Sequence, residues 1–318
     1  MPTLPELSAI REAQQLLAHY FPPTPLVMAQ SLSADGGEMY LKIETGLPTA
    51  SFKPRGAIYA LATNLKRRQI EEVTASSTGN HGAATAFAAK TLGVAATIFL
   101  PERANPVKLK KIEDLGARTI CHGSIDLAGA FQKAREYSQK PGIYFLNDAT
   151  DPDLPAGPAT IGLELTQQLQ DLSAVFVPMG DTALIRGVAA AIKALSPGTK
   201  VIGVQPEHAP SYVLSWRAGR PVPTDTCDTC ADGLATRTPE AENVEAIRKV
   251  VDEVRLVSEA QMLSAIHDLY ARENVLAEPS GAATTAAYLA QPVSGRVALL
   301  VTGANISDDI RRSAGIPA

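Results

Sequence analysis

The sequence predicts an α/β fold with two lobes, each built on a mostly parallel, twisted sheet flanked by helices. Short apolar runs rich in β-branched residues alternate with alanine-rich stretches of helical spacing along most of the chain. The runs are apolar throughout, as expected of strands that helices cover on both faces. With 318 residues, the chain is also longer than one hydrophobic core usually organises, which favours two lobes.

The first half of the chain begins with an amphipathic pattern that predicts a helix stopped at Pro22-Pro23. Pro101 then ends an apolar run and Gly116 ends a helical one, so both serve as boundaries. The strands predicted in this half are 73–76, 95–100 and 119–121, and the helices are 82–92 and 105–115.

The second half repeats the alternation of strand and helix. The strands predicted there are 174–177, 200–204 and 296–301, with a helix at 184–195. The polar stretch 221–244 is the longest predicted irregular region, and long loops in α/β enzymes often border the site. Ligands of such sheets bind where strands turn into helices, so these turns are the places to search for chemistry.

Composition argues against several kinds of partner. The net charge is −4, which offers no basic field for a nucleic acid. No apolar run is long enough to cross a bilayer, so we expect no membrane partner. Charged Glu6, Arg11 and Glu12 stand where a signal peptide needs an apolar stretch, so we expect a cytoplasmic protein.

The three cysteines, Cys121, Cys227 and Cys230, predict no disulfide framework and fit a reducing compartment. The spacing of Cys227 and Cys230 also occurs in redox pairs and in halves of zinc sites. A structural zinc would need a second pair, and a redox pair should open a helix after a strand. We therefore predict two loop cysteines without a redox or metal role.

Lys53 lies in the segment SFKPRGA, after an extended stretch and before a helical pattern that starts near Arg55. The positive end of a helix dipole and burial both disfavour an ammonium group. A neutral amine can form an imine with an aldehyde, so Lys53 is a candidate nucleophile. The alternative is an ordinary solvated lysine, as most lysines are.

Two turns could bind anions. In SSTGNHG, after the strand 73–76, Gly79 and Gly82 allow a tight turn whose N–H groups suit a carboxylate. An ordinary N-cap cluster with a structural His81 is the alternative. The turn PMGDTAL, residues 178–184, is similar to a phosphate cradle, although Asp181 would repel a phosphate unless it points away.

Taken together and in order, these motifs resemble the fold-type II pyridoxal-phosphate enzymes, and within them the branch of serine/threonine dehydratases and serine racemases. The main motifs are SFKPRGA, SSTGNHG, PMGDTAL, ADGLA and VTGAN, with Thr24-Pro-Leu26, Lys42-x-Glu44, Gly203-Val-Gln-Pro206 and Glu278-Pro-Ser-Gly-Ala282 in support. The resemblance implies a large cofactor-binding domain of residues 1–48 and 150–318. Residues 49–149 would form a smaller domain that closes on the substrate, and family habit favours a homodimer.

The resemblance implies pyridoxal 5′-phosphate as cofactor, held by Lys53 as an internal aldimine. Lys53 would later remove the substrate α-proton, and Thr302 would face the ring nitrogen. A hydroxyl there favours prompt loss of a β-hydroxyl. The other implied cofactor contacts are Phe52, Asn80, Gly180, Asp181, Thr182, Ala183 and Leu184, and the implied contacts to the substrate carboxylate are Ser77, Thr78, Gly79, Asn80 and His81.

The activity implied is β-elimination of water from a small hydroxy amino acid of the L-threonine or L-serine type, giving a 2-oxo acid and ammonia. A racemase is the alternative, because Thr78 keeps a hydroxyl where racemases of this family use a serine as the second acid–base group. β-Replacement enzymes look like SVKDR and TSGNT, which match poorly. A cofactor-binding protein with little turnover also stays open.

Departures from the family pattern predict an unusual pocket. The family's run of four glycines reads Gly180-Asp-Thr-Ala183 here, and its AGQGT segment reads Ala156-Gly-Pro-Ala-Thr160. Leu47 and Ala50 replace a family Gln and Gly. The positions of the racemase cation site look like Gln205, Ala209 and Ser211, which offer no carboxylate, so we predict no metal. The appended domain that senses isoleucine in longer dehydratases is not expected.

Overall fold

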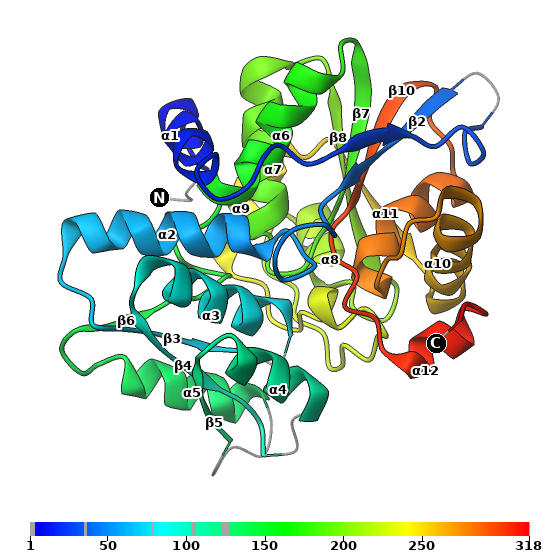
Figure 1. Ribbon diagram of the computed structural model, residues 1–318. Coiled ribbons are helices and arrows are strands. Elements are labelled where there is room, and N and C mark those ends of the chain that lie inside the picture. The colour runs from blue at the N-terminus through cyan, green and yellow to red at the C-terminus, as the bar shows by residue number, and fades with distance from the viewer. Residues whose placement is uncertain (1–3, 35–36, 78, 103–105, 122–126, 318) are drawn as a thin grey trace.

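The computed structural model describes residues 4–34, 37–77, 79–102, 106–121 and 127–317. It contains two sheets, and helices cover both faces of each (Figure 1). The predicted α/β class with mostly parallel sheets is confirmed.

The larger sheet has six strands in the order β1-β2-β10-β7-β8-β9. They are β1 (Leu26–Met28), β2 (Gly37–Ile43), β7 (Leu172–Pro178), β8 (Lys200–Pro206), β9 (Glu253–Val257) and β10 (Gly295–Val301). All neighbouring pairs are parallel except β1 and β2. Because β10 and β7 are parallel neighbours, their carboxyl ends lie side by side at one edge of the sheet.

Two layers of helices enclose this sheet. The helices are α6 (Ala156–Gln168), α7 (Ala183–Leu195), α8 (Ser211–Ala218), α9 (Ala241–Val250), α10 (Glu259–Glu273) and α11 (Pro279–Ala290). In β7, Phe176 packs with residues of α10 and α11, whereas Val175 and Val177 pack with residues of α7 and α9. Alternate side chains thus bury on opposite faces, which explains why the strand is apolar at every position.

The smaller sheet has four parallel strands in the order β5-β4-β3-β6. Its strands are β3 (Glu72–Ser76), β4 (Ala95–Phe99), β5 (Arg118–Ile120) and β6 (Ile143–Phe145), and its helices are α2 (Lys53–Arg67), α3 (Asn80–Leu92), α4 (Pro106–Asp114) and α5 (Leu127–Tyr137). Val73 and Ile98 pack with residues of α2 and α3 on one face. Phe99 packs with Ala130 and Ala134 of α5 on the other face.

Helix α2 joins the two sheets, because it packs on α3 of the smaller sheet and on α6 of the larger one (Figure 1). The close approach of α6 needs a glycine. A Cβ atom at Gly157 would lie 2.3 Å from the backbone oxygen of Arg55. Gly157, in the segment 156–160, therefore allows α6 to pack closely against α2, the helix that carries Lys53.

Three elements lie outside these layers: α1 (Leu7–Leu17), the 3₁₀ turn η1 (Asp232–Leu234) and α12 (Asp308–Ser313). Helix α1 is the predicted amphipathic N-terminal helix, and it buries Ile10, Ala13 and Leu17. Among the residues that the structure describes, no helix is both long enough and apolar enough to span a bilayer.

The structure corrects three predicted boundaries. The helix expected from residue 82 begins at Asn80, and the one expected near Arg55 begins at Lys53. The stretch 221–244 is not wholly irregular, because it contains η1 and the start of α9. Its polar residues concealed the buried face of α9, which includes Asn243, Val244 and Ile247.

Candidate functional site

The predicted site residues follow the carboxyl ends of three strands. Ser77 and Gly79 follow β3, the loop 179–182 follows β7, and Thr302 follows β10. The start of α2 is fixed to the end of β10, since the backbone N–H of Phe52 donates to the Thr302 oxygen at 3.0 Å. Ser51 also forms an isolated bridge with Gly303. These contacts hold Lys53 at the edge where the strands end.

Lys53 forms an ion pair with Asp148, a residue of the loop after β6. Its Nζ lies 2.6 Å from Asp148 Oδ2, and both side chains are 20% exposed. The Lys53 amine is therefore accessible and held in one direction.

His81 lies on the other side of Asp148, with its Nδ1 3.8 Å from Asp148 Oδ2. Its Nε2 lies 2.9 Å from the backbone oxygen of Leu146. A carbonyl only accepts hydrogen bonds, so Nε2 carries the proton and Nδ1 faces the carboxylate. Burial lowers the pKa of His81, against the charge of Asp148. His81 thus packs beside Asp148 and holds the loop after β6. These contacts agree with the structural role considered above better than with a contact to the substrate.

Asn80 is held by two partners at the start of α3. Its amide nitrogen donates to Glu278 Oε1 at 2.7 Å, and its amide oxygen accepts from Asn305 Nδ2 at 2.6 Å. Ser77 and Gly79 are half-buried beside it, and the Gly79 N–H donates to Ser77 Oγ at 3.2 Å. The turn therefore presents a fixed amide at a helix N-terminus, a place suited to an anion. Thr78 lies outside the described residues.

The loop after β7 leads into the N-terminus of α7. Gly180 is required, because a Cβ atom there would lie 2.5 Å from the Gly233 oxygen. Thr182 adopts a left-handed conformation with φ of 69°, while Ala183 and Leu184 begin the helix. The Asp181 carboxylate accepts a hydrogen bond from Thr236 Oγ1 at 3.0 Å. The loop has the strand–glycine–helix form of a phosphate site.

Three buried hydroxyls near these turns have no hydrogen-bond partner among the described residues: Ser76, Thr182 and Ser280. Ser280 Oγ lies 2.9 Å from where a Gly233 Cβ would stand, so it adjoins the wall of the β7–α7 loop. A buried polar group without a partner costs about 1–3 kcal/mol. Such hydroxyls are expected where a polar ligand completes the site.

Two carboxyl groups near Lys53 have opposite pKa shifts. Burial would raise the pKa of Asp148, but the neighbouring His81 ring and the Lys53 amine hold it well below its usual range. Burial, reinforced by the charge of Asp148, raises the pKa of Asp181 to about 6. Asp181 thus binds a proton more readily than an ordinary aspartate, which reduces its repulsion toward a phosphate.

A buried ion-pair network fixes the helix that carries Lys53. Arg55 Nε lies 2.8 Å from Glu44 Oε2, and its Nη1 lies 2.6 Å from Glu164 Oε1. Lys42 Nζ contacts Glu164 Oε2 at 2.5 Å. The network joins α2 to β2 and to α6, which explains why Lys42 and Glu44 alternate with apolar neighbours near the end of a buried strand.

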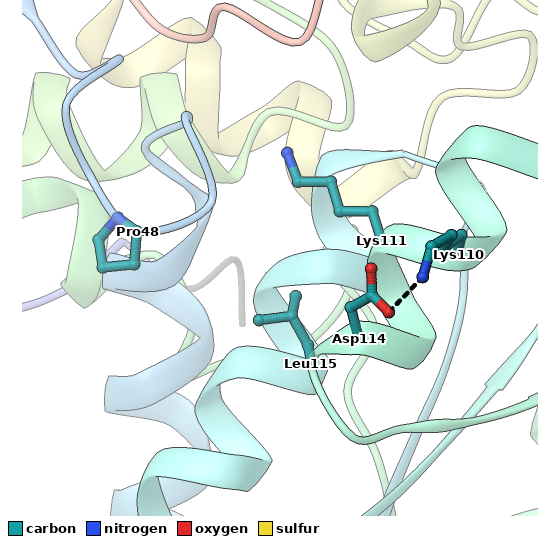
Figure 2. Close-up of a pocket in the computed structure, with 5 residues that line it drawn as sticks. All are labelled: Pro48, Lys110, Lys111, Asp114 and Leu115. Atoms are coloured by element: carbon teal, nitrogen blue, oxygen red, sulfur yellow. Dashed lines mark hydrogen bonds and ion pairs between the residues drawn. The ribbon is translucent and has the colours of Figure 1, made fainter.

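Lys111 of α4 extends the site toward the surface. Its Nζ lies 2.5 Å from Asn305 Oδ1 and 3.3 Å from the Thr49 oxygen. Figure 2 shows Lys111 pointing away from the neighbouring pair of Lys110 and Asp114. These residues, with Pro48 and Leu115, line a pocket of about 420 Å³. A chain of hydrogen bonds therefore runs from this pocket through Asn305 to Asn80.

Comparison with known proteins decides the family. Residues 17–303 match the family described as pyridoxal-phosphate dependent enzyme. The chain belongs to this family. It is 40% identical to an L-threonine ammonia-lyase of Thermotoga maritima over 94% of this chain and 75% of that one.

Solved structures agree with this assignment. A processed threonine deaminase isoform 2 from Solanum lycopersicum has a TM-score of 0.90 and 29% identity, covering 99% of this chain and 90% of that one. A maize serine racemase has a TM-score of 0.91 and 27% identity, covering 98% and 97%. The predicted resemblance to the fold-type II pyridoxal-phosphate enzymes is confirmed.

The residues present fit pyridoxal phosphate. The partnerless hydroxyl of Thr182 and the N-terminus of α7 suit its phosphate group. Lys53 offers an amine, and its Nζ lies 5.6 Å from the centre of the Phe52 ring. The altered glycine run keeps Gly180, where the Gly233 oxygen leaves no room for a side chain.

The sequence did not point to Asp148, which pairs with Lys53, or to Lys111, which donates to the Asn305 that holds Asn80. Both contacts join segments that are distant in the chain. A useful signal for Asp148 was the polar pair Asn147-Asp148 after the apolar run 143–146, since strand ends carry site residues.

The positions that match the racemase cation site, where we predicted no metal, hold side chains with partners in the protein. Gln205 Oε1 accepts from the Val213 N–H, and Ser211 Oγ donates to the Thr236 oxygen. Burial raises the pKa of Cys230 to about 12, which opposes thiolate chemistry. In the described residues, no group of three or more His, Cys, Asp or Glu side chains is arranged to hold a metal.

Proposed function

We propose that this chain is an ammonia-lyase that eliminates water from a small hydroxy amino acid such as L-threonine or L-serine. The products are a 2-oxo acid and ammonia. The observation that carries the proposal is the accessible Lys53 amine at the strand edge where Asn80 and the partnerless hydroxyl of Thr182 also lie. The similarity to the Thermotoga maritima L-threonine ammonia-lyase supports the substrate class.

The turn after β3 binds the substrate carboxylate. Backbone N–H groups at the start of α3 attract an anion, and the side chains of Ser77 and Asn80 add hydrogen bonds. Asn80 is oriented in advance by Glu278 and Asn305, so it loses little entropy on binding. From the family resemblance, Thr78 and Gly79 complete the proposed substrate turn, whereas the buried His81 supports it through its contact with the Leu146 oxygen.

Lys53 removes the α-proton of the bound amino acid. The α-C–H bond breaks, and the proton moves to Nζ of Lys53. Pyridoxal phosphate, when bound through its phosphate to residues 180–184, supplies the electron-accepting ring for this chemistry. Phe52 and Thr302 would help to hold the cofactor, with the Thr302 hydroxyl as the neutral partner that the family resemblance assigns to the ring nitrogen. The β-hydroxyl then takes up a proton and leaves as water, and a second water hydrolyses the resulting enamine to the 2-oxo acid and ammonia.

A racemase is the second candidate, because the maize serine racemase covers nearly the whole chain with a TM-score of 0.91. Racemisation needs the same proton removal by Lys53 and a return of the proton from the opposite face. Thr78 carries the only side-chain hydroxyl that the family resemblance assigns to that role. The two activities share every step up to proton removal, and only the products distinguish them.

The test is a product analysis of the cofactor-loaded protein with L-threonine, L-serine and threo-3-hydroxyaspartate. A lyase releases 2-oxo acid from at least one of them, and the rate survives EDTA if no metal takes part. A racemase instead yields the D-amino acid on chiral chromatography. Release of neither product from any of the three would refute the proposed function.

Three further predictions belong with this proposal. The two sheets are consistent with a large domain of residues 1–48 and 150–318 and a smaller domain of residues 49–149 that closes on the substrate. The homodimer is proposed from family habit, and the cytoplasmic location from the composition. Sedimentation and cell fractionation test the last two directly.

A further inference from the structure

We propose that Asp148 is a positioning residue that pairs with the cationic nitrogen of Lys53 and thereby holds that side chain at the cofactor. The proposal rests on the proposed function, because it assigns a partner to the lysine of that reaction. It starts from the 2.6 Å contact between Lys53 Nζ and Asp148 Oδ2.

Asp148 is well placed for this role because its loop is anchored on both sides. Before it, the Leu146 N–H donates to the Thr74 oxygen at 2.9 Å, and the Leu146 oxygen contacts His81 Nε2 at 2.9 Å. After it, the Ala149 oxygen accepts from Arg186 Nη2 and from Asn243 Nδ2, each at 3.0 Å. The carboxylate is thus fixed between the smaller sheet and the helices α7 and α9.

The turn itself is also stabilised locally. Asn147 Oδ1 accepts from the Ala149 N–H at 3.0 Å, and the Asp151 N–H donates to the Asn147 oxygen at 2.9 Å. Asn147 Nδ2 further donates to Thr150 Oγ1 at 2.8 Å. A carboxylate on such a turn has little freedom to move away from Lys53.

The charged groups around Asp148 leave Lys53 as its principal partner. Lys53 reaches it from α2, His81 from α3 at 3.8 Å, and Asp181 from the β7–α7 loop. His81 donates its Nε2 hydrogen bond to the Leu146 oxygen, so its unprotonated Nδ1 faces Asp148. Asp181 is a carboxyl group like Asp148 and cannot form an ion pair with it. Only Lys53 makes a short, direct ion pair with Asp148 among the described residues.

This arrangement has a consequence for the reaction. Lys53 becomes an ammonium when it accepts the α-proton, and a carboxylate at 2.6 Å stabilises that charge where it forms. With the cofactor bound, the same carboxylate would favour the protonated form of the Lys53 nitrogen. Asp148 acts on the reaction through Lys53, without touching the substrate.

The experiment is a pH titration of the visible absorbance of the cofactor-loaded protein, without substrate. Asp148→Asn removes the negative charge of the side chain and keeps its size and shape. The pH midpoint at which the cofactor-linked Lys53 nitrogen loses its proton should therefore fall by about one to two pH units. Asp153→Asn is the matched control, because Asp153 follows in the same segment but pairs with Arg67. Its titration curve should match that of the parent protein.

Asp148→Glu provides the second variant. It restores the carboxylate and should return the midpoint toward the parent value, and it should recover cofactor loading if Asp148→Asn loads poorly. With L-threonine, kcat of Asp148→Asn should fall about 10- to 100-fold, as for other misplacements of a reacting group.

Two outcomes would overturn the proposal. One is an absorbance curve of Asp148→Asn that coincides with the parent curve at every pH. The other is a glutamate variant as defective as the asparagine variant, since the charge would then be irrelevant. Failure of the proposed function gives a different pattern, because a protein that releases no 2-oxo acid can still show the shifted absorbance curve.

Discussion

Asn80 and Glu278 lie 2.7 Å apart, although 198 positions separate them in the chain. The contact joins the first residue of α3, beside the smaller sheet, to the N-cap of α11, beside the larger sheet. The proposed substrate turn, which follows a strand of the smaller sheet, is therefore held by a residue beside the larger sheet. Contacts of this kind define the site, and they lead to the following predictions.

Thr182→Val should weaken cofactor binding without weakening the fold. Its hydroxyl is buried and has no partner among the described residues, so its loss costs the cofactor-free protein nothing. A hydrogen bond to a charged group contributes about 1.5–3 kcal/mol, so the Kd for pyridoxal phosphate should rise at least about tenfold. Fluorescence titration measures the Kd, and urea unfolding measures the stability.

Thr284→Val is the contrasting variant for that test. Thr284 Oγ1 is equally buried but donates to the Leu300 oxygen at 3.0 Å. It should lose about 1 kcal/mol of stability and keep the parent Kd. An unchanged Kd in Thr182→Val would show that this hydroxyl does not contact the phosphate.

Asp181→Asn should stabilise the cofactor-free protein at neutral pH. The folded pKa of Asp181 is about 6, above its ordinary 3.8, so the folded state binds the proton more tightly. The contribution of Asp181 to stability is therefore most favourable below pH 3.8, and it falls as the pH rises from 3.8 to about 6. Asparagine removes the penalty, which we place at about 1–2 kcal/mol at pH 7.5 because the side chain is partly exposed.

Urea unfolding at several pH values checks this sign. The advantage of Asp181→Asn should shrink as the pH falls toward 4, where the parent carboxyl is protonated. The exposed Asp225→Asn serves as control and should follow the parent curve. A variant that is less stable than the parent at pH 7.5 would contradict the assignment.

Glu164→Gln should destabilise the fold strongly. Glu164 contacts both Arg55 and Lys42, and the two cations would be left buried with less negative charge. Removing one member of a buried ion pair costs about 3–5 kcal/mol. In the exposed pair of Lys110 and Asp114, Asp114→Asn should cost less than about 0.5 kcal/mol. Equal losses in the two variants would refute the structural role of the network.

Lys111→Met should impair substrate binding more than folding. Lys111 donates to Asn305, which in turn donates to Asn80. Loss of this hydrogen bond removes about 0.5–1.5 kcal/mol of the free energy that orients Asn80 for the substrate. The KM for L-threonine should therefore rise about 2- to 10-fold, with a smaller change in kcat. The adjacent exposed Lys110→Met should leave both constants unchanged, and steady-state kinetics decides between these results.

The alternation of strands and helices was predictable because each buried strand is apolar at nearly every position. Val73–Ser76 and Arg296–Val301 were found in this way, to within one residue of the observed bounds. The order of the strands was not predictable, because β10 inserts between β2 and β7 through contacts across the whole chain. Strand β2 was missed because Glu38 and Lys42 interrupt its apolar pattern.

The site was only partly predictable for the same reason. Motifs located Lys53, Asn80 and Thr182 because each lies at a strand–helix turn with a distinctive local sequence. Asp148, which pairs with Lys53, and Lys111, which donates to the Asn305 that holds Asn80, come from segments without such a motif. A local sequence shows which groups carry chemistry, whereas their charge and orientation depend on neighbours that only the fold brings together.

The most direct test of the account is 2-oxo acid release from L-threonine by the parent protein and by Lys53→Ala, both supplied with pyridoxal phosphate. The account predicts steady release by the parent and a loss of about 10²–10⁴-fold or more in the variant, since Lys53 is the base for the α-proton. Equal rates in the two proteins, or no release by the parent, would contradict it.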